Sequence, residues 1–120
     1  MASTRHTLGQ VEGSGALFIA GTCTPSGGNV ATLSNLVGPL AMQADMTATL
    51  ASSVFTLTVA PFIGPLGNAV AMVCPTATSG IVRVDSQTYT ADSLAVVVKT
   101  FNVDGTTAAD KAFNFEIWAS

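Results

Sequence analysis

Hydrophobic and polar residues alternate along several short segments of the chain, with the period of two that is typical of half-buried β-strands. Phe55, Leu57 and Val59 alternate with threonines, and residues 81–85 alternate in the same way. Turn-forming Gly, Pro, Ser and Thr separate such segments at intervals of roughly 8–15 residues, and no segment keeps a helical period over a dozen residues. The pattern predicts an all-β fold, either an antiparallel β-sandwich or a jelly-roll-like barrel.

The C-terminal third shows the clearest strands. Residues 94–103 form a long β-branched run, and residues 112–118 alternate between apolar and polar positions. The loop between them begins with Asp104-Gly105, a strong turn dipeptide, so the two strands are predicted to form a C-terminal antiparallel hairpin. Residues 94–98 are apolar on both faces, which indicates a central strand or one covered by a neighbouring subunit.

Two further segments complete the expected architecture. Residues 69–74 are uniformly apolar and end at Pro75, which predicts a short buried strand. Residues 1–13 are polar and lack periodicity, so they are expected to form a flexible N-terminal arm, while residues 14–120 form a single β-sandwich domain.

Charged residues are scarce in this chain, which bears on the kind of surface that it presents. Charged residues make up 9% of the sequence and hydrophobic residues 48%, whereas globular chains average about 25% charged residues. Apolar runs are too short to span a bilayer, so we expect no membrane association. The excess apolar surface then predicts self-assembly or docking onto a larger structure.

The basic residues argue against a nucleic-acid partner. Lys and Arg number four against seven acidic residues, and they are scattered along the chain rather than clustered as phosphate binding requires. The N-terminus also lacks an apolar signal core, so synthesis in the cytoplasm is expected.

Residue types that carry catalysis or bind metals are few. His6 is the only histidine and lies in the predicted arm, while Cys23 and Cys74 lack CxxC spacing and a basic neighbour. Two reduced, mostly buried thiols are favoured over a disulfide. We therefore expect no catalytic residues, no metal site and no cofactor.

Four carboxylates are candidates for catalysis or cation binding. Nothing in the sequence selects Asp85 and Glu116 as a glycosidase pair, although it does not exclude them. Asp104 and Asp110 have oxygens that calcium accepts, but turn-forming aspartates are the commoner explanation for this loop.

The aromatic residues leave two interpretations open. Trp118 and Tyr89 together suit a sugar-stacking platform, and core packing or an interface anchor is the favoured alternative. If alternation holds, Trp118 lies on the polar face of its strand with Asn114 and Glu116, which makes it an interface candidate.

The C-terminal block LAVVVKTFNVDGTTAADKAFNFEIWAS resembles the ending of small β-sandwich proteins of tailed-phage virions. Phe113, Phe115, Ile117 and Trp118 carry this likeness. The resemblance implies a non-enzymatic virion component on the capsid surface, namely a cement (decoration) protein that stabilises the shell. It implies a homo-oligomer, a trimer in preference to a dimer, with the major capsid protein as partner.

This interpretation assigns two sets of contact residues. The candidates for the oligomer interface belong to the C-terminal strands: Val96, Val98, Phe113, Phe115 and Trp118. The candidates for a latch on the capsid belong to the arm: Arg5, His6, Leu8 and Val11.

The alternative function is a receptor- or carbohydrate-binding module of a phage fibre or tail. Its loop aromatics would be Phe62 and Tyr89. A small enzyme is the least favoured class, because the sequence holds one histidine and no catalytic motif.

Overall fold

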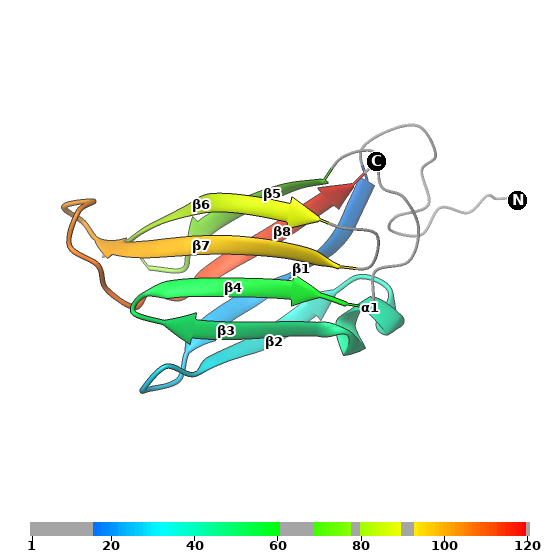
Figure 1. Cartoon of the computed structure of the whole chain (residues 1–120), viewed down its shortest axis with the longest axis horizontal. Coiled ribbons are helices and arrows are strands. Elements are labelled where there is room, and N and C mark those ends of the chain that lie inside the picture. The colour runs from blue at the N-terminus through cyan, green and yellow to red at the C-terminus, as the bar shows by residue number, and fades with distance from the viewer. Residues whose placement is uncertain (1–15, 61–68, 78–79, 90–92, 120) are drawn as a thin grey trace, which may run out of the picture.

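The structure is a computed structural model, which describes residues 16–60, 69–77, 80–89 and 93–119 (Figure 1). Within these ranges the chain forms eight strands and one short helix, which follow in this order: β1 (Ala16–Pro25), β2 (Ala31–Val37), α1 (Leu40–Ala44), β3 (Met46–Ala51), β4 (Val54–Val59), β5 (Ala69–Pro75), β6 (Gly80–Tyr89), β7 (Leu94–Asn102) and β8 (Phe113–Ala119). The strands make two four-stranded antiparallel sheets, in the orders β2-β1-β8-β5 and β3-β4-β7-β6. The predicted β-sandwich is confirmed, and the sheets do not close into a barrel.

The chain passes repeatedly between the two layers. β1–β2, β3–β4 and β6–β7 are antiparallel neighbours within a sheet, whereas the other connections cross from one sheet to the other. β2 contacts β3 along one open side of the sandwich, and β5 contacts β6 along the other, as Figure 1 shows.

The core lies between the sheets and is built from alternate residues of the central strands. Phe55 of β4 and Phe113 of β8 meet edge to face, with ring centroids 5.1 Å apart. The buried apolar residues are Ile19, Cys23, Met46, Leu50, Phe55, Leu57, Val59, Leu94, Val96, Val98, Phe113, Phe115 and Ile117. The apolar positions of the alternating strands therefore face this core.

The predicted C-terminal hairpin is wrong, because β7 and β8 belong to different sheets. The connection 103–112 first turns back onto the end of β7, where Phe101 bridges to Ala108 and the Thr100 hydroxyl donates to the Ala109 carbonyl at 2.5 Å. It then crosses to the other sheet, where β8 pairs with both β1 and β5. A connection much longer than a two-residue hairpin loop allows this crossing, and it lets the apolar faces of β7 and β8 face each other across the core.

The apolar run at residues 94–98 is explained by the position of β7 between β4 and β6. Leu94, Val96 and Val98 are buried in the core, while Ala95 and Val97 are half-buried on the outer face. The prediction of a central strand is confirmed, and no neighbouring subunit is needed to account for the run.

The turn between β3 and β4 consists of Ser52 and Ser53, both with positive φ, at 51° and 63°. Two consecutive left-handed residues are typical of the tight hairpin turn that Asn-Gly usually supplies. Its second serine is tied to the neighbouring loop, because the Ser53 hydroxyl donates to Asp110 Oδ1 at 2.7 Å. This turn sets the unbroken register in which β3, at the edge of the sheet, pairs with β4.

Candidate interaction surface

The carboxylates considered for catalysis lie on different sheets. Asp85 of β6 is 3.4 Å from the Lys99 ammonium on the outer face of one sheet. Glu116 of β8 belongs to the other sheet and accepts a hydrogen bond from the Trp118 indole nitrogen at 3.3 Å. The structure does not bring Asp85 and Glu116 together as a catalytic pair.

Asp104 organises the turn after β7. Its carboxylate accepts hydrogen bonds from the Thr106 and Thr107 backbone amides at 2.9 and 2.8 Å, and from the Thr107 hydroxyl. Asp110 is instead held by Ser53. These contacts confirm the interpretation of Asp104 as a turn-forming residue, and within the described residues no three His, Cys, Asp or Glu side chains gather as a metal site.

These hydrogen bonds predict a specific pH response. The Thr107 hydroxyl, followed by the Thr107 and Thr106 amides, lowers the pKa of Asp104 from 3.8 to about 2. Between these values the unfolded chain binds the proton more tightly, so the turn's contribution to stability is complete above about pH 4 and is lost as pH falls through about 2. Carboxyl carbon shifts followed by NMR during acid titration should give the low Asp104 pKa.

Thr107→Val provides the comparison, because it removes the hydroxyl and keeps the amide. The pKa of Asp104 should rise toward 3.8 in this variant, and it should rise less in Thr106→Val. An unchanged Asp104 pKa in Thr107→Val would contradict the assigned cause.

The two cysteines lie on opposite faces of one sheet. Cys23 is buried in the core, and burial raises the pKa of its thiol to about 12. Cys74 of β5 is exposed, and both thiols are free. The prediction of two reduced, buried thiols is right for Cys23, but the burial part is wrong for Cys74.

Four of the five predicted interface residues are part of the chain's own core. Val96 and Val98 of β7 and Phe113 and Phe115 of β8 are each at most 2% exposed. They face the opposite sheet because strand alternation points them inward, so they offer no area to a partner, and their assignment to an interface is wrong. Trp118 differs: it is 36% exposed on the outer face with Asn114 and Glu116.

Trp118 is part of an apolar strip that the sequence did not reveal. In the pairing of β5 with β8, Val70 lies opposite Trp118 and Met72 opposite Glu116. Val70 and Met72 are 53% and 57% exposed. We call Val70, Met72 and Trp118 the outer strip.

The strip was missed because residues 69–74 are apolar on both faces. Such a run is typical of a strand covered on both sides. Among the described strands, β5 is instead an edge strand that pairs only with β8, and its outer face carries Val70, Met72 and the exposed Cys74. Hydropathy alone does not distinguish these two situations, so the prediction of a buried strand is wrong for one face of β5.

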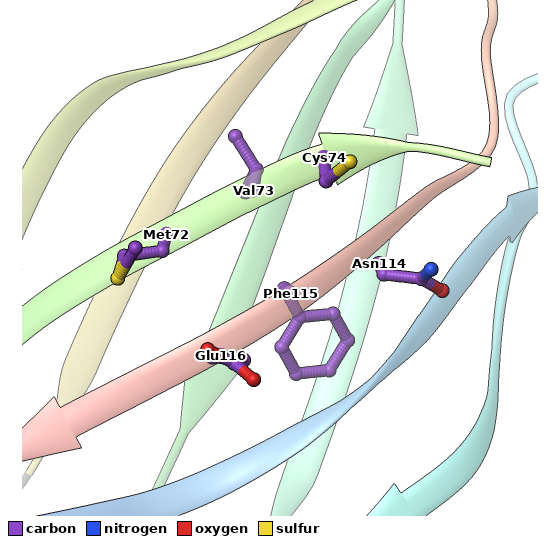
Figure 2. A pocket seen from close by; sticks show the side chains of 6 residues that line it. All are labelled: Met72, Val73, Cys74, Asn114, Phe115 and Glu116. Carbon is purple, nitrogen blue, oxygen red and sulfur yellow. The ribbon is translucent and has the colours of Figure 1, made fainter. Parts of the chain in front are cut away.

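Figure 2 shows the middle of this region, where Met72 and Cys74 of β5 lie beside Glu116 and Asn114 of β8. A hollow of about 250 Å³ is present there, lined by residues 72–74 and 114–116. This volume lies below the roughly 300–1,000 Å³ of typical ligand pockets. The region is therefore better suited to a broad contact with a macromolecule than to enclosing a small molecule.

Apolar exposure continues around this end of the sandwich. Across the sheet, Glu116 is followed by Ala20 of β1 and then by Val37 of β2, which is 48% exposed. Leu40 of α1 is 81% exposed. Exposed apolar side chains are thus also present beyond the outer strip, on β2 and α1, with the Glu116 carboxylate between the strip and Val37.

The outer face of the second sheet has a different character. Its edge and neighbouring strands present Thr47 opposite Thr58 and Thr49 opposite Thr56. Charged residues, including Arg83, whose guanidinium lies 4.8 Å from the Phe101 ring centre, are on the β6–β7 side of the same sheet. The outer face of one sheet therefore carries the apolar outer strip, whereas that of the other carries threonines and charged side chains.

Several predicted contact residues fall outside the described residues. These are the latch candidates Arg5, His6, Leu8 and Val11, the loop residue Phe62, and the side chain of Tyr89. The described chain begins at Ala16, which pairs with Ala119 in the strand that carries Trp118.

Among the described residues no helix has the length and apolar character needed to cross a membrane. Comparison of the chain with protein-family models, with curated proteins and with solved structures found no match.

Proposed function

We propose that this chain is a non-enzymatic structural protein of a virion, which binds the outside of a tailed-phage capsid as a cement (decoration) homo-oligomer. The observation that carries the proposal is the outer strip, where Val70, Met72 and Trp118 remain between 36% and 57% exposed on a chain with 9% charged residues. An exposed apolar patch bordered by polar residues is typical of a protein contact surface. The C-terminal resemblance supplies the capsid as the proposed partner.

The expected energy of one contact is modest. Complete burial of a large apolar side chain stabilises by about 1.5–3 kcal/mol, so covering the exposed part of each strip residue contributes on the order of 1 kcal/mol. Many copies bound to one shell would add such contributions through multivalency. The protein would act mechanically, by covering apolar surface at subunit junctions of the shell.

The arm of residues 1–13 extends this proposal. A latch carried by Arg5, His6, Leu8 and Val11 would add a second contact with the shell to that of the outer strip. The arm and the strip would then contact neighbouring parts of the shell.

Removing the apolar character of the strip should abolish shell binding. The variant Val70→Thr, Met72→Gln, Trp118→Gln keeps β-compatible or similarly long side chains, so the sandwich should stay folded by circular dichroism. Its co-sedimentation with purified capsids of the encoding virus is expected to fall at least tenfold, because the loss of a few kcal/mol in contact energy changes affinity by that factor or more.

The matched control removes exposed apolar side chains elsewhere on the sandwich. Val30, Ile81 and Val103 are 54%, 39% and 67% exposed, and their replacement by threonine should leave shell occupancy unchanged. Equal loss in both triple variants, or full occupancy by the strip variant, would contradict the proposal. A chain of residues 14–120 tested in the same way should also fail to bind, and its normal occupancy would remove the latch from the proposal.

A receptor- or carbohydrate-binding module of a fibre or tail is the alternative. The exposed Trp118 indole beside the Glu116 carboxylate favours it, because sugar sites combine a stacking ring with a hydrogen-bonding group. Glycan-array binding that is lost in Tyr89→Ala or Trp118→Gln would support this alternative over capsid cementing.

A further inference from the structure

Each sheet of the sandwich has two edge strands, and edges with unpaired backbone groups are sites where another chain can pair. The four edges are β2 and β5 in one sheet and β3 and β6 in the other. Natural proteins protect such edges with bulges, prolines, charges or covering side chains. Among the described residues, three of these four edges carry such protection, and the fourth does not.

β2 and β6 are protected by bulges. The register between β1 and β2 shifts opposite residues 20–22, and Asn35 of β2 has a left-handed φ of 53°. In β6 the register shifts between Val84 and Ser86, and the intervening Asp85 pairs with Lys99 at 3.4 Å. A bulge bends the strand and interrupts the ladder that an incoming strand would need.

β5 is protected by a side chain and a proline. The Ala71 backbone amide donates to the Gln87 side-chain oxygen at 2.5 Å, so an outer-edge donor is already occupied by a residue of β6. Pro75, at the end of the strand, has no amide hydrogen to offer. A strand approaching β5 would meet an occupied donor and a missing one.

β3 has none of these features. Its six residues, MTATLA, contain no proline and no charge, and they pair with β4 in an unbroken register from Met46 opposite Val59 to Ala51 opposite Val54. Among the described residues, the backbone hydrogen bonds outside the strand ladders do not involve β3. Within the described residues, its outer edge is therefore regular, uncharged and without a ladder partner, although β2 of the other sheet packs nearby.

We propose that β3 pairs antiparallel with β3 of a second copy of this chain, so that the sheets β3-β4-β7-β6 of two copies form one continuous eight-stranded sheet about a two-fold axis. The inference deepens the homo-oligomer part of the proposed function, although its argument depends only on the strand edges. It gives a dimer in place of the trimer that the C-terminal resemblance implies.

Identical strands fit together in this geometry. Antiparallel neighbours must place inward residues opposite inward residues, and the two registers that do so over most of β3 are centred on Ala48 and on Thr49. The first register pairs Thr47 with Thr49 of the other copy, and the second pairs Thr49 with its own equivalent. Cross-strand threonine pairs are favourable, and with no charge in the strand no like charges oppose one another.

A second copy is favoured over an unrelated strand because the edge is self-complementary. Thr47 and Thr49 are exposed on the outer face, and Met46 and Leu50 are buried toward the core. The two-fold operation therefore continues the polar outer face and the apolar inner face without a mismatch. Two-fold pairing also covers the β3 edge of both copies, whereas an asymmetric pairing would leave one β3 edge free to bind further chains.

The test introduces charge at this edge. Thr47→Lys with Thr49→Lys places ammonium groups opposite each other in both registers, which opposes pairing, and both sites are exposed, so the single chain should stay folded. Sedimentation equilibrium should give twice the 12.1 kDa chain mass for the wild type and the mass of one chain for this variant. Thr32→Lys with Ser34→Lys, which adds equal charge to exposed positions of the β2 edge, should remain dimeric.

Hydrogen exchange keeps the test independent of the variant's folding. In the wild type, the β3 amides that point away from β4 should exchange slowly at high concentration and at least tenfold faster on dilution to the monomer. A wild-type mass of one or three chains, a dimer that persists in Thr47→Lys with Thr49→Lys, or outer β3 amides that stay fast at high concentration would each overturn the proposal. The Val70→Thr, Met72→Gln, Trp118→Gln variant should remain dimeric, so failure of pairing and failure of shell binding are distinguishable.

Discussion

Phe113→Ala is expected to destabilise the sandwich by about 3–5 kcal/mol, the usual cost of removing a buried phenylalanine ring and leaving a cavity. Phe113 is 0% exposed and lies against Phe55 in the centre of the core. Domains of this kind have a total stability of about 5–15 kcal/mol, so the variant should unfold at a much lower urea concentration or lack a cooperative transition. Chemical denaturation followed by circular dichroism measures this loss.

The same substitution separates a core residue from an interface residue. If Phe113 mainly contacted a partner, the alanine variant would keep its stability as a monomer and lose only its association. Met72→Ala is the matched comparison, because Met72 is 57% exposed on the outer face, and it should cost no more than about 1 kcal/mol. Similar stability losses in the two variants would contradict the placement of β8 at the centre of its sheet.

Gly21→Ala is expected to cost about 1–3 kcal/mol, although alanine is otherwise suited to a strand. A methyl group added at Gly21 of β1 would lie 2.6 Å from Leu36 Cδ2, 3.0 Å from the Ser34 carbonyl oxygen and 3.1 Å from Phe115 Cζ. The leucine tip can move, but the backbone oxygen and the buried ring have little freedom. The close approach occurs where β2 bulges against β1, so the glycine is required by the pairing of these strands.

Gly80→Ala provides the control for this prediction. Its added methyl group would meet carbons of the Lys111 side chain at 2.8 and 2.9 Å, and a flexible lysine can move away. The free energy of unfolding should therefore change by less than about 0.5 kcal/mol. Equal costs at Gly21 and Gly80, measured by urea titration, would show that the tight packing around Gly21 is not rigid.

The central strands could be predicted from the sequence because their side chains have one dominant environment. In β4, buried Phe55, Leu57 and Val59 alternate with threonines that face outward. β8 follows the same rule with Phe113, Phe115 and Ile117, and this alternation placed Trp118 correctly on the polar face. The period of two is a local property of the extended backbone, so a short stretch of sequence is enough to show it.

The partner of each strand was not predictable in the same way. The Asp104-Gly105 turn suggested that β7 and β8 pair, but the turn only reverses the chain locally before it crosses the sandwich. Both strands have strong apolar faces, and those faces satisfy each other equally well side by side in one sheet or opposed across two. The choice depends on residues far away in the sequence, namely β1 and β5, which enclose β8.

For the candidate surface, the sequence identified Trp118 and the general shortage of charge, but it assigned the remaining interface to core residues. The sequence predicts Val70 and Met72 to be buried, because a uniformly apolar strand gives no sign of which face is covered. Exposure in β5 follows from its place at the edge of the sheet, with β8 as its single neighbour in the ladder.

Local sequence was enough to predict an all-β fold with alternating strand faces, either a sandwich or a jelly-roll-like barrel, because periodicity and turn residues act over a few positions. Long-range contacts establish which strands are central and which form edges, and with that the outer strip and the β3 edge that no described residue protects. These features depend on long-range pairing, in which each strand's exposure is set by neighbours that the local pattern does not specify.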